Sequence, residues 1–128
     1  TMIKKILSGF IGGLLEIIFS INNLSVFSTI SYHVLRIDSV IVGILLHLIA
    51  AIIIALVGIS IIEVTKVRYE NRNFLSTLIM GILFGSAVLS LFSLPVHLLV
   101  FPIKITLTYV LAHIFYGIIT YLVYSFFK

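Results

Sequence analysis

The feature that most constrains the fold is an uncharged apolar run over residues 39–62, which begins directly after Asp38. As an α-helix with a rise of about 1.5 Å per residue, this run would be about 36 Å long. The hydrocarbon core of a bilayer is about 30 Å thick, so such a helix would cross it with some tilt. The run therefore predicts a transmembrane helix.

The composition of the whole chain points to the same class of protein. Hydrophobic residues make up 62% of the 128 residues, charged residues make up 9%, and the mean hydropathy is +1.35. A soluble domain of this length has too little interior to hide so much apolar surface, so the composition indicates an integral membrane protein. The chain has no cysteine, which excludes disulfides, thiolate metal sites and cysteine nucleophiles.

Three further apolar runs have helical length, and they cover residues 6–30, 74–94 and 105–127. Together with residues 39–62 they predict an all-α integral membrane four-helix bundle that occupies residues 1–128 as a single domain. Pro95 is expected to end or kink the third helix. The short apolar piece from Pro95 to Pro102 is then expected in the membrane interface or dipping into the membrane.

Most positive residues fall on one predicted side of the membrane, and only Arg36 and Lys104 fall on the other. The positive-inside rule then predicts that both termini are cytoplasmic and that the chain lies in the cytoplasmic (inner) membrane. Topology accounts for the net charge of +4, so the expected partners are lipid and other membrane protein subunits, and neither nucleic acid nor a soluble substrate is implied. The positive residues on the predicted inner side are Lys4, Lys5, Lys66, Arg68, Arg72 and Lys128.

Small residues recur at helical spacing in every predicted helix, as GxxxG pairs in the first and third helices and beside a histidine in the second and fourth. Small side chains let neighbouring helices approach closely in lipid, so these positions are expected to lie at helix contacts. The predicted packing positions are Gly9, Gly13, Gly43, Ala51, Gly58, Gly81, Gly85 and Gly117.

The two halves of the chain share this pattern. In each half, a helix that begins inside carries a GxxxG pair, and the helix that follows carries a histidine at a similar distance from its outer end. The pattern suggests two parallel hairpins related by a pseudo-two-fold axis along the membrane normal.

Three ionisable residues are predicted at a similar depth in the membrane. Glu16 would lie about 15 Å from the inner boundary, and His47 and His113 about 12–14 Å from the outer one. A charged carboxylate there costs about 2.5–3.5 kcal/mol, so each group is expected to be paired, neutral or facing water. A hydrogen bond between Glu16 and a histidine would satisfy both groups.

This predicted trio leaves several interpretations open. His47 and His113 could be the axial ligands of a haem b, as in other helical bundles. The two histidines with Glu16 could instead bind a divalent metal, or the three residues could relay protons. The simplest alternative is that the histidines only fix helix packing. His97, near the predicted outer boundary, is interpreted as an ordinary loop histidine.

Four short passages resemble one family of membrane proteins. They are Gly9–Leu14 (GFIGGL), Gly43–His47 (GILLH), Gly81–Gly85 (GILFG, leading to Pro95) and Ala112–Gly117 (AHIFYG). In order and spacing they resemble the YagU-like family of small, uncharacterised four-helix inner-membrane proteins. The resemblance implies four spans and makes His47 and His113 characteristic positions. It implies no settled activity, and Glu16 has no counterpart in the pattern.

Three functional predictions follow for a chain with so little structure outside the membrane. The first is a non-catalytic accessory subunit of a larger membrane complex, of a respiratory or other redox type. The second is an electron-transfer protein that carries haem or metal on His47 and His113. The third is a proton or ion conductor that uses Glu16 with the two histidines.

Overall fold

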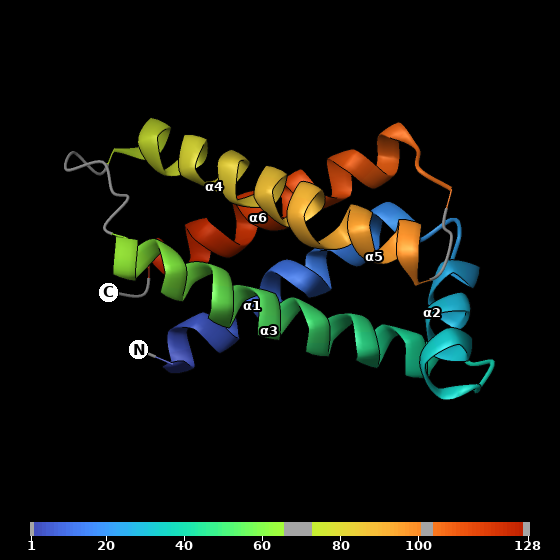
Figure 1. The fold of residues 1–128 in the computed structure, drawn as a ribbon. Helices are drawn as coiled ribbons and strands as arrows, with labels where there is room; N and C mark the ends of the chain where they lie inside the picture. The colour runs from blue at the N-terminus through green and yellow to red at the C-terminus, as the bar shows by residue number, and fades with distance from the viewer. Residues whose placement is uncertain (1, 66–72, 101–103, 127–128) are drawn as a thin grey trace.

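The computed structural model describes residues 2–65, 73–100 and 104–126, and every regular element in these ranges is helical, as the sequence predicts (Figure 1). Lys66, Arg68, Arg72, Pro102 and Lys128, which entered the predictions above, lie outside the described residues. The elements are α1 (Met2–Glu16), the 3₁₀ turn η1 (Ile17–Ser20), α2 (Ser25–Leu35), α3 (Val40–Thr65), α4 (Phe74–Val88), the π-turn η2 (Leu89–Ser93), α5 (Leu94–Leu99) and α6 (Leu107–Phe126).

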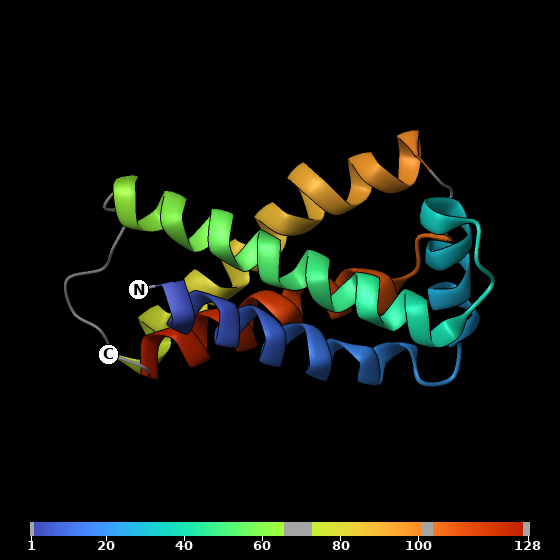
Figure 2. The same ribbon diagram turned by 90° about the horizontal axis from the view of Figure 1, so that it is seen from below.

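Three helices of the described part are long and apolar enough to cross a membrane: Val40–Thr65, Phe74–Leu99 and Leu107–Phe126. Together with α1 they run lengthwise through the molecule, and α2 lies across one end (Figures 1 and 2). Helix α1 packs against both α3 and α6, α4 packs against α6, and α2 packs against α3. The start of α1 and the end of α6 lie at the end of the molecule away from α2.

The predicted continuous helix over residues 6–30 is wrong, because the chain turns at residues 21–24. Asparagine side chains form local hydrogen bonds that compete with the helix, and here Asn23 Oδ1 accepts from Ser25 Oγ at 2.7 Å. Its backbone carbonyl also accepts from the Val26 N–H at 3.3 Å. The lengthwise part of this segment is therefore α1 with η1, about 30 Å long, and the remainder forms α2.

The third helix does not end at residue 94 as predicted, since the helical path continues to Leu99. Pro95 has no N–H and its ring crowds the carbonyl four residues earlier, so it normally interrupts an α-helix. Here the π-turn η2 precedes it, and the Leu94 N–H bonds the Leu89 carbonyl five residues back. This wider turn places Pro95 in the first turn of α5. Residues 95–99, which were expected in the membrane interface, therefore form the last part of this helix.

Helix α3 has two faces of different character. Every fourth residue on one face is an exposed aliphatic side chain, whereas Ala51, Ala55 and Ile59 on the opposite face are buried. A continuous exposed apolar row fits contact with lipid, where it costs nothing, and would be costly in water. The exposed row is Ile41, Leu45, Ile49, Ile53, Val57 and Ile61.

The predicted packing glycines lie where another helix comes very close. A Cβ added at Gly9 would stand 2.6 Å from the Ala55 Cβ of α3. One added at Gly85 would stand 2.7 Å from the His113 carbonyl oxygen of α6, and Gly117 lies directly against Gly85. No larger side chain fits these contacts without moving a backbone. The GxxxG pairs therefore join α1 to α3 and α4 to α6.

Replacing Gly85 by leucine tests the contact between α4 and α6. The added side chain would force the two backbones apart, and overpacking of this kind costs about 1–3 kcal/mol or more. Unfolding by SDS titration in mixed micelles is expected to show at least this loss in Gly85→Leu. Leu83→Phe, at a 55% exposed position of the same helix, is the control and should unfold like the parent. Equal stability of Gly85→Leu and the parent would contradict the close contact.

Candidate functional site

A cavity of about 810 Å³ lies in the half of the molecule that contains α2. Its walls come from the end of α1, η1, α2, the first half of α3, the end of α4, η2, α5 and the first half of α6. Its lining includes the exposed residues Asn22, Asn23, Lys104 and Thr106, so the cavity reaches the surface at this end. The three predicted ionisable residues all line it.

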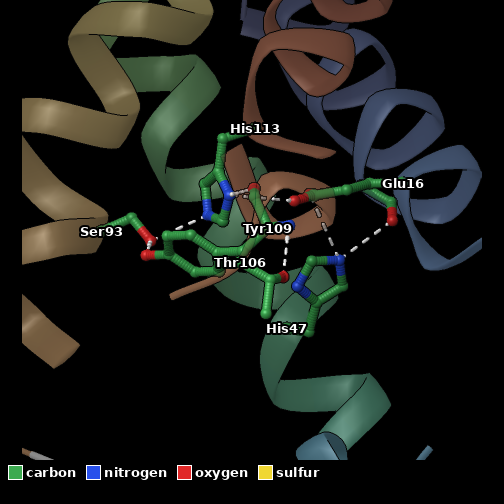
Figure 3. A network of polar contacts seen from close by, with 7 residues as sticks. Glu16, His47, Ser93, Thr106, Tyr109 and His113 are labelled. Carbon is green, nitrogen blue, oxygen red and sulfur yellow. Dashed lines mark hydrogen bonds and ion pairs between the residues drawn. The ribbon is translucent and has the colours of Figure 1, made fainter. Parts of the chain in front are cut away.

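Glu16, the last residue of α1, lies between the two histidines (Figure 3). One carboxyl oxygen is 3.6 Å from Nε2 of His47 on α3, and the other is 3.8 Å from Nδ1 of His113 on α6. The residue is 8% exposed, so its carboxyl group is held away from bulk solvent. Three helices thus meet at this carboxyl group, as the depth argument predicts for the trio.

His47 is oriented by the backbone of α1. Its Nε2 lies 3.0 Å from the carbonyl oxygen of Gly13, and the ring of Phe27 packs edge-on against the imidazole at 5.6 Å. A carbonyl oxygen only accepts hydrogen bonds, so this contact requires a proton on Nε2. The nitrogen nearest Glu16 is therefore a donor.

His113 is held at both ring nitrogens. Its Nδ1 lies 2.8 Å from the Tyr109 carbonyl oxygen, so Nδ1 carries a proton. In the neutral ring Nε2 is then an acceptor, and it lies 2.8 Å from the Ser93 hydroxyl. The Tyr109 hydroxyl bonds the same serine oxygen. A chain of hydrogen bonds therefore runs from Tyr109 through Ser93 to His113.

The predicted hydrogen bond between Glu16 and a histidine is not formed. Both carboxyl-to-imidazole distances are longer than the 2.7–3.2 Å of a normal N–H···O bond. Backbone carbonyls of the adjacent helical turns compete for the histidine protons, at 3.0 Å for His47 and 2.8 Å for His113. Glu16 therefore lies beside both histidines without a direct hydrogen bond to either of them.

The site does not fit a haem held by His47 and His113. Axial ligation needs two imidazole lone pairs aimed at one iron between them. The Glu16 carboxyl lies between the rings instead, and the acceptor nitrogen of His113 is directed at Ser93. In this arrangement the two imidazoles do not present lone pairs to a common iron.

The predicted metal site of His47, His113 and Glu16 is not found among the described side chains. Within residues 2–65, 73–100 and 104–126, no group of three or more His, Asp or Glu side chains is placed to hold a metal ion.

Sequence reasoning missed the residues that orient His113. Tyr109 and Ser93 are not among the predicted site residues, yet both form hydrogen bonds at the site. The spacing of Tyr109 and His113, four residues apart on one helix, places them on the same face and could have linked them. His97 lies in α5 and not in a loop, with its ring 5.4 Å from that of Tyr109.

A second polar cluster lies at the opposite end of the same helices. Lys5 forms an ion pair with Glu63 at 3.2 Å and donates to Ser60 Oγ at 2.9 Å. The Tyr124 hydroxyl donates to the other Glu63 oxygen at 2.6 Å. The cluster ties together the terminal ends of α1, α3 and α6.

A tightly packed layer separates the two clusters. Tyr116 is 2% exposed and donates its hydroxyl proton to the Ala51 carbonyl at 2.5 Å. Ala55, Ile59 and Thr120 have no exposed surface. The lining of the cavity ends at this layer, so the cavity opens toward the end of the molecule that contains α2.

A scan against protein-family models and searches of curated proteins and of solved structures found no match to the chain. The resemblance to YagU-like proteins stays a prediction from the four motifs.

The haem geometry is tested by an oxidised-minus-reduced spectrum of the mildly solubilised protein after incubation with haem b. Since the carboxyl of Glu16 lies between the imidazoles, no band of a bis-histidine haem is expected. A b-type band that disappears in both His47→Ala and His113→Ala would contradict this arrangement.

Proposed function

We propose that this chain is a proton-translocating membrane protein, and that the Glu16 carboxyl beside His47 and His113 is its proton-binding group. The observation that carries the proposal is the placement of this carboxyl, which is buried between two imidazoles and lines a cavity that reaches the surface. An ionisable residue inside a membrane protein is costly, and such residues commonly serve proton or ion pathways.

The proposed topology is a transmembrane bundle of four helices, with α1 and η1 as the fourth crossing. Their combined length of about 30 Å matches the hydrocarbon core. Helix α1 lies lengthwise against α3 and α6, and it carries Lys4 and Lys5 at one end. Arg36 and Lys104 lie near the other end, beside α2 and α6. This distribution supports cytoplasmic termini in the inner membrane.

The proposed repeat draws support from the two GxxxG contacts. The pair in α1 faces α3 close to His47, and the pair in α4 faces α6 at His113. In each hairpin the glycine helix thus meets the histidine helix at the level of the site. The two histidines then approach Glu16 from two separate hairpins.

The groups around Glu16 are suited to passing protons stepwise. His47 faces it from α3, and His113 and Tyr109 line the same cavity from α6. Imidazole groups bind and release protons near neutral pH, and a neighbouring carboxyl group can exchange a proton with them. The packed layer at Tyr116 argues against a continuous water-filled pore. It favours a site that exchanges protons with one side of the membrane at a time.

Small-residue faces left open to other chains would favour the predicted accessory subunit. The glycines of both GxxxG pairs contact helices of this chain, so these positions offer no second surface to a partner. The proton-binding site is favoured because a specific arrangement of side chains supports it.

Single-cysteine labelling tests the proposed crossing of α1, since the chain has no native cysteine. In intact expressing cells, a membrane-impermeant maleimide should label Ile37→Cys from outside. Met2→Cys should be labelled only after permeabilisation, because its end of α1 faces the cytoplasm. Both positions are well exposed, at 49% and 69%. Labelling of both from the same side would show that α1 does not cross the membrane.

Proton flux into liposomes tests the proposed function. Vesicles that hold a pH-sensitive dye should acidify under an imposed potential when they contain the wild-type protein. Glu16→Gln removes the exchangeable proton and should lower the rate at least about tenfold, as loss of a proton-transfer group typically does.

Glu63→Gln is the matched control for this measurement. It makes the same chemical change at the opposite end of the bundle, outside the cavity lining, and should keep the wild-type rate. Equal flux in wild type and Glu16→Gln, or wild-type flux no greater than in empty vesicles, would overturn the proposal.

A further inference from the structure

We propose that the cavity binds a small protonated amine with an apolar body, and that its ammonium group docks on Glu16 in exchange for a proton. This inference gives the proposed proton-binding site a ligand class, and it rests on that function for the exchange step. The binding step rests on the cavity itself.

The first observation is the unmet hydrogen-bonding capacity of Glu16. Its side chain is 10% exposed, yet within the described residues no group donates a hydrogen bond to either oxygen. The nearest nitrogens, at 3.6 and 3.8 Å, give their protons to backbone carbonyls. A buried carboxylate requires donors, and the cavity beside it is the space from which a donor can come.

The second observation is the character of the walls. Phe19, Phe27 and Phe92 line the cavity together with Tyr109. Aromatic faces attract organic cations, and a volume of about 810 Å³ falls in the range of sites for drug-sized molecules. The cavity therefore suits an apolar or aromatic body attached to a positive head group.

The charge expected of the ligand follows from the Glu16 carboxylate at the inner end of the cavity. An anionic ligand would be repelled by the Glu16 carboxylate. A ligand with only a carbonyl group would offer this carboxylate no hydrogen-bond donor, because both groups are acceptors. An ammonium group brings both the opposite charge and N–H donors. The other titratable groups that line the cavity are His47, His97, Lys104, Tyr109, His113 and Tyr116. Of these, Lys104 is exposed and lies in the segment before α6.

A proton and an ammonium group would compete for the same carboxylate. Either one neutralises it, and after protonation the carboxyl no longer attracts a cation. Binding of the amine therefore releases the proton from Glu16, and protonation releases the amine. No covalent bond to carbon forms or breaks in this exchange.

The test uses the full chain in lipid nanodiscs with dansylcadaverine, a fluorescent ring on an alkyl chain that ends in a primary ammonium group. We expect saturable binding to the wild type, weakened about ten- to a hundredfold in Glu16→Gln, as for loss of one charged hydrogen bond. Glu63→Gln should bind like the wild type. N-pentyl dansylamide has the same ring and a similar chain without the ammonium group. Its affinity for the wild type should be no higher than its affinity for Glu16→Gln.

Wild-type protein offers a second readout that does not require a variant to fold. Dicyclohexylcarbodiimide modifies protonated carboxyl groups in apolar surroundings, and peptide mass spectrometry locates the adduct. Dansylcadaverine should protect Glu16 from this reagent, whereas the neutral analogue should not.

Equal affinity of the amine for wild type and Glu16→Gln, equal affinity of the amine and its neutral analogue, or no protection of Glu16 would each overturn the ligand proposal. The outcomes for the two proposals are separable. Glu16-dependent proton flux without amine binding would refute only the proposed ligand. Glu16-dependent amine binding without proton flux would support the proposed ligand site and refute the proposed proton translocation.

Discussion

The arrangement of this protein depends on the close approach of helix backbones at glycine. In lipid there is no hydrophobic force between helices, so their association relies on packing and on polar contacts. Gly9 and Gly13 let α1 lie directly on α3, and that contact brings the Gly13 carbonyl within reach of His47. Glu16 follows one turn later on the same helix, so the backbone contact that holds α1 in place also sets the position of its carboxyl. The site is therefore a product of the packing.

The two ends of the molecule treat charge differently. Near the termini, Lys5 and Glu63 meet at 3.2 Å and neutralise one another, with Tyr124 as a further donor. At the cavity, Glu16 has two imidazoles nearby whose protons are directed elsewhere. The Glu63 carboxylate accepts a hydrogen bond and forms an ion pair within the chain, whereas Glu16 accepts no hydrogen bond from the residues that the structure describes. Such a contrast between two acidic residues is expected when one has a structural role and the other binds something exchangeable.

Much of the fold follows from apolar length and small-residue spacing. Those signals place α3 and α6 within a few residues of the observed bounds and bring Glu16, His47 and His113 to a common level. The turn at residues 21–24 is harder to predict, because apolar residues continue on both sides of Asn22 and Asn23. It depends on α2 finding a surface, and α2 packs with Phe27 directly over Gly43. The partners of each imidazole nitrogen are also hidden from sequence, since carbonyls of neighbouring turns determine them.

The π-turn before Pro95 has a consequence for how this site tolerates changes in chain length. A π-turn holds one more residue than the α-turn it replaces, so it rotates everything that follows by about 100° around the helix axis. Ser93 belongs to this turn, and His97 follows it in α5. Deleting a single residue from Leu89–Ser93 would leave an apolar helix of nearly the same length. It would nonetheless turn the side chains of α5 away from their present directions, while α4 kept its contact with α6. The number of residues in this one helical turn therefore matters to the site as much as the side chains do.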